Sequence, residues 1–103
     1  MNLRGKQKRY LRSQANQLSP IFAIGKDGLS ENWLKQLDGA LDRRELIKVN
    51  ILQNSDVTVD QAKDYIERQT DISCVQVIGR VLVLFKVSAN KDWRDLSNRV
   101  KKI

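Results

Sequence analysis

The chain has 103 residues, which predicts one domain large enough to bury a hydrophobic core. Hydrophobic residues make up 41% and charged residues 30%, which is typical of folded globular proteins and excludes a disordered or fibrous chain. The formal net charge is +7, and with no histidine and a single cysteine the chain lacks the usual ligands of a zinc site and the commonest general base.

The first part of the chain predicts a helix, a short strand and a second helix. Apolar residues recur at helical spacing over residues 3–17, and this helix must end before Pro20, because the residue preceding a proline avoids the helical region. Residues 21–24 form a short apolar run typical of a strand. Ser30 is a good N-cap for a helix over 31–42.

The rest of the chain predicts a strand, a helix and a hairpin of two strands, over residues 45–52, 59–70, 72–78 and 81–87. Thr58 and Gln61 have the spacing of a capping box at the start of the third helix. Gly79 and Arg80 separate the last two strands, and glycine in the first position favours a type II′ turn.

This order of elements predicts an α/β (α+β) domain over residues 1–87 with a small mixed sheet. Strand–helix–strand units favour parallel neighbours, and the final hairpin adds an antiparallel strand. The last strand is apolar on both faces, so we expect helices on both sides of the sheet, with the first helix opposite the other two. Residues 88–103 form a tail in which Trp93, Leu96 and Val100 lie on one side of a short helix.

The excess positive charge lies at one end of the sequence. Residues 1–26 contain no acidic residue and six of the 19 basic residues: Arg4, Lys6, Lys8, Arg9, Arg12 and Lys26. The rest of the chain has 13 basic and 12 acidic residues, so its charges nearly cancel. A local basic surface favours polyanions, because binding releases their counterions. The alternative is a charge that only maintains solubility, but a solubilising charge has no reason to be one-sided.

Several functional classes are disfavoured by what the sequence lacks. Cys74 lies among apolar residues of a predicted strand with no histidine to activate it, so we interpret it as structural. No apolar run approaches the roughly 20 residues of a membrane helix. A single cysteine permits no disulfide within the chain and fits a reducing compartment. We therefore expect a cytoplasmic protein that is not an enzyme and that has no metal, cofactor or small-molecule substrate.

The segment Gly25, Lys26, Asp27 and Gly28 places two glycines around two polar residues, just before a helix. A P-loop needs four residues between its glycines, and a dinucleotide-binding loop needs a third glycine, so neither pattern is met. A GxxG loop of this length clamps the nucleic-acid backbone in KH domains. An ordinary turn remains the alternative from the loop alone.

Four segments resemble one family: KQKRYLRSQA at 6–15, LSPIFAIGKDGLSE at 18–31, RELIKVNI at 44–51 and CVQVIGRVLVLFK at 74–86. Together they resemble YhbY-type bacterial proteins, the single-domain form of the CRM domain (chloroplast RNA splicing and ribosome maturation). The resemblance covers residues 2–87. It implies an α-β-α-β-α-β-β fold with a four-stranded mixed sheet, similar to the C-terminal domain of translation initiation factor three.

The resemblance also implies RNA binding, with precursors of the large ribosomal subunit and their ribosomal RNA as partners. The implied RNA-binding residues are those of the loop and of the first helix: Gly25, Lys26, Asp27 and Gly28, with Lys6, Lys8, Arg9 and Arg12. Arg80 in the hairpin turn is a further candidate contact. Asp27 departs from the neutral residues common at its position, and its carboxylate would repel a solvated phosphate by about 1 kcal/mol.

Three other functions remain open at this point. The chain could bind an RNA that is not ribosomal, or it could be a protein-interaction module whose basic helix docks on acidic ribosome-assembly partners. An enzyme is the third and the least favoured, because the chain has no histidine. RNA binding differs from protein docking in its steep dependence on salt.

Overall fold

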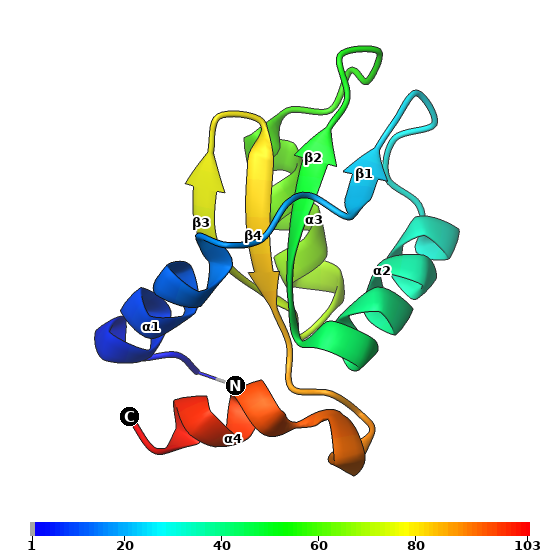
Figure 1. Cartoon of the computed structure of the whole chain (residues 1–103). Helices are drawn as coiled ribbons and strands as arrows, with labels where there is room; N and C mark the ends of the chain where they lie inside the picture. Colours follow the sequence, from blue (N-terminus) through cyan, green and yellow to red (C-terminus); the bar gives the residue numbers. More distant parts are fainter. Residues whose placement is uncertain (1) are drawn as a thin grey trace.

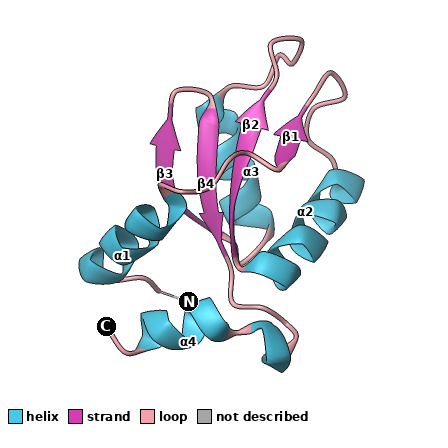
Figure 2. Cartoon of the chain, in the orientation of Figure 1, coloured by secondary structure: helices cyan, strands magenta, loops and turns pink. Residues whose placement is uncertain are grey.

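The computed structural model describes residues 2–103, which form four α-helices, a short 3₁₀ helix and one four-stranded sheet (Figure 1 and Figure 2). In chain order the elements are α1 (Gly5–Ala15), β1 (Phe22–Ile24), α2 (Glu31–Arg44), β2 (Leu46–Ile51), α3 (Val59–Gln69), β3 (Ser73–Ile78), β4 (Val81–Phe85), η1 (Lys91–Trp93) and α4 (Asp95–Lys101). The predicted order is confirmed, and the tail adds η1 and α4.

The sheet is mixed, as predicted, with the strand order β1-β2-β4-β3. β1 lies parallel to β2 and pairs Phe22 with Val49. β4 runs antiparallel to both of its neighbours, so the final hairpin inserts its second strand into the middle of the sheet. The ends of β1 and β2 therefore lie at the same edge of the sheet as the β3–β4 turn, which positions three loops together.

Helices cover both faces of the sheet, as the apolar last strand predicts. On one face, Leu82 and Leu84 of β4 pack in a core cluster with residues of α2 and α3. On the other face, Val83 and Phe85 pack with Leu11 of α1. Alternate residues of one strand thus belong to two separate clusters, since successive side chains of a strand point to opposite faces.

Local capping explains where the helices begin. The Ser30 hydroxyl accepts a hydrogen bond from the Trp33 N–H at 3.0 Å. Thr58 and Gln61 form the reciprocal capping box that their spacing predicts. In the β3–β4 turn Gly79 has a φ of 59°, which fits the predicted type II′ turn because only its first central residue needs a positive φ.

The predicted bounds of several elements need correction. α1 ends at Ala15 instead of residue 17, so Leu18 is not helical and its side chain is exposed. β2 begins at Leu46, because Glu45 adopts a left-handed conformation with a φ of 63° and is the C-cap of α2. Its N–H donates to the Leu41 carbonyl at 2.7 Å. Glycine usually marks such a C-cap, so the sequence carried no signal for it.

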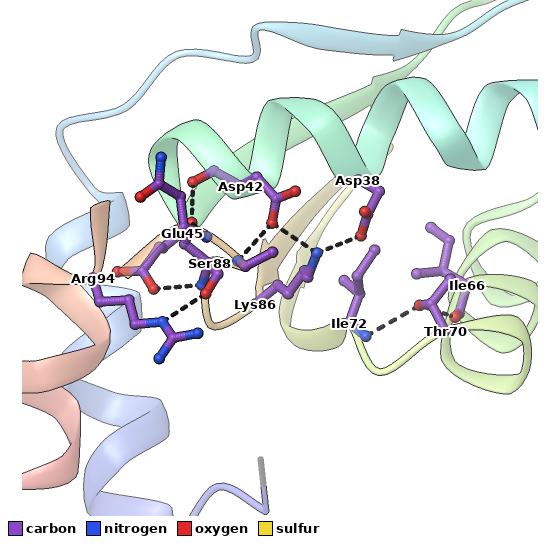
Figure 3. A network of polar contacts seen from close by, with 11 residues as sticks. Asp38, Asp42, Glu45, Ile66, Thr70, Ile72, Lys86, Ser88 and Arg94 are labelled. Carbon is purple, nitrogen blue, oxygen red and sulfur yellow. Dashed lines mark hydrogen bonds and ion pairs between the residues drawn. The ribbon is translucent and has the colours of Figure 1, made fainter. Parts of the chain in front are cut away.

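The tail packs against the rest of the molecule. Val100 is fully buried in the cluster around Leu11, and the buried Gln7 donates from its Nε2 to the Val100 carbonyl at 3.1 Å. The buried Glu45 carboxylate accepts the N–H of Ser88 at 2.7 Å and that of Ser97 at 2.9 Å. Figure 3 shows Glu45 and Ser88 at this junction. The tail is therefore anchored by a charged group of the core.

A polar network fixes the start of the tail to α2 (Figure 3). The Lys86 ammonium lies 2.6 Å from Asp38 and 2.8 Å from Asp42. The Ser88 hydroxyl donates to the Asp42 carbonyl at 2.6 Å, and Arg94 Nε donates to the Ser88 carbonyl at 2.7 Å. The Lys86 side chain is only 10% exposed, whereas Asp42 is 24% and Asp38 45% exposed, so the pair with Asp42 is the better shielded of the two.

Candidate nucleic-acid interface

The glycine loop is a tight turn at the end of β1. The Gly28 N–H donates to the Gly25 carbonyl at 3.1 Å, and Gly28 has a φ of 70°. Lys26 and Asp27 form the exposed tip. Among residues 2–103, the N–H groups of this tip have no protein acceptor, and neither side chain takes part in an ion pair. The tip therefore offers two amide donors and two opposite charges to solvent.

The turn rests on the loop that follows β2. The Leu52 N–H donates to the Ile24 carbonyl at 2.9 Å. A Cβ added at Gly25 would meet Leu52 Cδ1 at 3.7 Å, and one added at Gly28 would meet Val57 Cγ2 at 3.5 Å. Both glycines thus lie next to the β2–α3 loop, which packs against the base of the turn and leaves its tip exposed to solvent.

A shallow hollow of about 270 Å³ separates the turn from the first two turns of α2. Asn32, Trp33 and Gln36 line it together with the turn itself. Trp33 is held in place, because its Nε1 donates to the Ala23 carbonyl at 2.9 Å and its ring lies 5.4 Å from that of Phe22. Lys26 and Asp27 both line this hollow beside the N-terminus of α2. The lysine and the helix dipole favour an anion there, whereas the Asp27 carboxylate opposes one.

Arg80 lies at the same edge of the sheet as the turn. Its Nε donates to the Ile51 carbonyl at 3.1 Å, and one terminal nitrogen donates to the Leu52 carbonyl at 2.8 Å. Because the Leu52 N–H bonds to the carbonyl of Ile24, the residue before Gly25, the guanidinium is tethered close to the glycine turn. Two of its guanidinium nitrogens are therefore used in hydrogen bonds to backbone carbonyls, but its positive charge still lies at this edge of the sheet.

The structure does not place the basic helix beside the glycine turn. α1 lies on the sheet face opposite α2 and α3, whereas the turn leads directly into α2. Figure 1 shows α1 and the β1–α2 turn at opposite corners of the view. Lys6, Lys8 and Arg9 are exposed and Arg12 is half-buried. The predicted residues thus form two basic surfaces, with part of the sheet between them.

Lys48 lies on the sheet between these two surfaces, and the sequence prediction missed it as a candidate contact. It follows Leu46 by two residues in β2, so it points to the face that α1 covers, and it is half-buried. The alternation along β2 places Lys48 on the face opposite Ile47. The sequence predicted helices on both faces of the sheet, but it did not reveal which helix lies on the face of Lys48.

The described residues contain neither a cluster of metal ligands nor an activated thiol. No three histidine, cysteine, aspartate or glutamate residues within 2–103 are grouped so that they could hold a metal ion. Burial raises the pKa of the half-buried Cys74 thiol, which is the opposite of what a nucleophile needs. None of the helices in this range has the length and apolar character to cross a membrane.

The chain is a small mixed-sheet domain with an exposed glycine turn and a separate basic helix. The family model of the CRS1 / YhbY (CRM) domain matches residues 3–86, and the chain belongs to this family. The resemblance and the fold that the sequence predicted are therefore confirmed.

Relatives extend this assignment. The chain is 45% identical over 86 residues to "Probable RNA-binding protein YqeI" of Bacillus subtilis, covering 84% of this chain and 90% of that one. It is 37% identical over 83 residues to an "RNA-binding protein" of Haemophilus influenzae, covering 81% and 84%. The solution structure of the hypothetical protein SAV1595 from Staphylococcus aureus has a TM-score of 0.69 and 46% identity, covering 87% and 94%.

Proposed function

We propose that this protein binds RNA without catalysing a reaction, and that in the cytoplasm it assists maturation of the large ribosomal subunit by contacting ribosomal RNA in its precursors. The observation that carries the proposal is the acid-free stretch of residues 1–26, whose six basic residues are divided between α1 and the glycine turn. The names of the relatives, which describe RNA binding, support the same partner class.

The two basic surfaces would contribute differently to binding. The cations of α1 attract the phosphate backbone over a distance and give no sequence preference. The glycine turn acts at short range, where the tip amides and Lys26 can contact one or two phosphates. Lys48 lies between them, so an RNA that touches both surfaces would cross the exposed part of the sheet. The tethered Arg80 adds a charge at the far end of this path.

A salt titration with three variants tests the proposal. For a fragment of large-subunit ribosomal RNA, we expect a log–log slope of affinity against salt of about −0.7 for each single-strand phosphate neutralised. Lys26→Glu should weaken binding without unfolding the domain, because an exposed loop lysine contributes little packing. Asp27→Asn should leave the affinity equal or raise it. Lys35→Glu, at an exposed position of α2, is the matched control for charge reversal.

Three outcomes would contradict this proposal. A flat salt dependence would favour the protein-interaction module over RNA binding. Equal losses for Lys26→Glu and Lys35→Glu would remove the glycine turn from the interface. A clear loss of affinity for Asp27→Asn would show that the carboxylate takes part in binding instead of opposing it.

A further inference from the structure

A groove of about 430 Å³ lies far from the glycine turn, between the end of α2, the segment before β1 and the tail. Leu46 and Leu96 contribute apolar surface to it. Leu18, Ile21 and Trp93 also line it, with 38%, 49% and 38% of their surface exposed. These are three of the six large hydrophobic residues exposed within residues 2–103, so exposed apolar surface is concentrated here.

Charged groups of both signs surround this apolar surface. Arg43 and Arg44 come from the last turn of α2, Arg99 from α4, and Asp92 and Asp95 from the tail. None of these five side chains forms an ion pair within the described part of the chain. Around the apolar surface of the groove, the arginines can therefore donate charged hydrogen bonds and the aspartates can accept them.

One of the arginines is already stacked. The Arg43 guanidinium carbon lies 4.6 Å from the centroid of the Trp93 ring. Arginine planes and tryptophan rings are the side-chain surfaces on which unpaired RNA bases stack. The groove thus combines a flat π surface with an apolar floor, which is the environment that a nucleobase needs when it leaves the stack of its own strand.

The arginines and aspartates that line the groove favour guanine over the other RNA bases. Guanine presents two acceptors, O6 and N7, that suit arginine, and the N–H donors N1 and N2 that suit a carboxylate. Three arginines would also attract a phosphate, but Asp92 and Asp95 need hydrogen-bond donors, which a base edge offers and a phosphate does not. The carboxylates therefore favour a base edge over the backbone. We propose that this groove binds one unpaired guanine of an RNA strand, an inference that rests on the proposed RNA-binding function.

The position of the groove fits a strand that is already bound by α1. Gln14 of α1 lines the groove, so an RNA held by the cations of this helix can extend into it. Asp92, Trp93, Asp95 and Arg99 all follow residue 86, where the family match ends. The tail therefore supplies five of the 14 residues that line the groove, and the matched domain does not contain them.

The test compares short RNAs that differ at one nucleotide. An oligouridine with one central guanosine should bind the full chain about tenfold more tightly than the same RNA with a central cytidine, which is within the range of one bidentate base contact. Trp93→Leu and Arg43→Gln should each abolish this preference, and neither should weaken the binding of oligouridine more than Arg68→Gln does. Arg68→Gln on α3 is the control for loss of an arginine outside the groove.

Trp93→Leu should remain folded, because Val100 and Ser97 anchor the tail independently of Trp93. A nuclear magnetic resonance titration with guanosine 5′-monophosphate supplies a second readout. It should shift the Trp93 indole signal, and cytidine 5′-monophosphate should not.

Each remaining outcome overturns the inference. If both RNAs bind equally and guanosine monophosphate leaves the indole signal in place, the groove does not take guanine, while the RNA-binding function stands; a segment of a partner protein then becomes its better occupant. If neither RNA nor guanosine monophosphate binds, the inference and the proposed function both fail.

Discussion

Gly25 and Gly28 stand at the two ends of one turn but place different demands on it. Gly28 needs its positive φ of 70°, which residues with a side chain adopt at a cost, whereas Gly25 has no such constraint. We expect Gly28→Ala to lower the free energy of unfolding by about 1 kcal/mol and Gly25→Ala to change it much less. Urea unfolding of the two variants measures both, and equal losses would show that the conformation of Gly28 is not the cause.

At the scale of single residues, the sequence predicts the positions that depend only on neighbouring residues in the chain. Lys26 and Asp27 were expected at an exposed turn, and Ser30 at a helix start, because glycines and a capping hydroxyl act over a few neighbouring positions. The contacts of Glu45 and Arg80 could not be predicted in this way, although Arg80 lies in the turn that the sequence predicts. Their partners lie dozens of residues away in the chain, so their roles depend on the tertiary structure.

At the scale of elements, the network between α2 and the strand end makes stability depend on pH. Burial raises the pKa of the Asp42 carboxyl, but the hydrogen bonds from Lys86 and from the Ala89 N–H, and the Lys86 charge, together hold it below its ordinary value. Burial lowers the pKa of Lys86, but its bonds to Asp38 and Asp42 raise it overall.

The signs of these shifts define where the network stabilises the fold. A carboxyl pKa that is lowered on folding contributes above the unfolded value of about 3.9, and the contribution is lost as the pH falls through the folded value. A raised lysine pKa contributes below about 10.4 and is lost as the pH rises through the folded value. Both contributions are therefore complete at neutral pH.

We expect Lys86→Met to lower the free energy of unfolding by about 2 kcal/mol at neutral pH, since it leaves two neighbouring carboxylates without their cation. Arg68→Met, which breaks the exposed pair with Asp64, should cost no more than about 0.5 kcal/mol. The difference between the wild type and Asp42→Asn should shrink as the pH falls below about 4. A difference that is independent of pH would show that the charge of Asp42 is not what matters.

The elements themselves were largely predictable, and their ends were not. Hydrophobic spacing located every helix and strand of the sheet domain, because each buries one face or both. The ends of α1 and β4 were placed two residues too far, since apolar residues such as Leu18 and Val87 continue the pattern beyond the last residue of the element. The packing of α4 on α1 needed the three-dimensional structure, because a short amphipathic helix fits many surfaces.

At the scale of the whole molecule, the tail completes the core on the α1 side of the sheet. We expect truncation after Val87 to lower the free energy of unfolding by at least about 3 kcal/mol, because it exposes the cluster around Leu11 and leaves the Glu45 carboxylate buried without its two donors. Adding Glu45→Asn to the truncated chain should restore part of this loss, since asparagine is neutral and tolerates the left-handed conformation. Urea unfolding compares the three chains.

An unchanged stability of the truncated chain would show that the tail is only loosely attached. A larger loss with Glu45→Asn than without it would show that solvent, rather than the tail, satisfies the carboxylate. Either result would also weaken the inference about the groove, whose tail residues need a fixed position.

The bond between Glu45 and the tail also limits how this chain can change over generations. While the tail is present, the acid at position 45 is an anchor; once the tail is lost, the same acid is a buried charge that opposes folding. A shorter descendant is therefore accessible only after residue 45 has become neutral, and a neutral residue 45 removes much of the reason to keep the tail. We therefore expect residue 45 to become neutral before the tail is lost, and we expect chains that keep the tail to keep the acid.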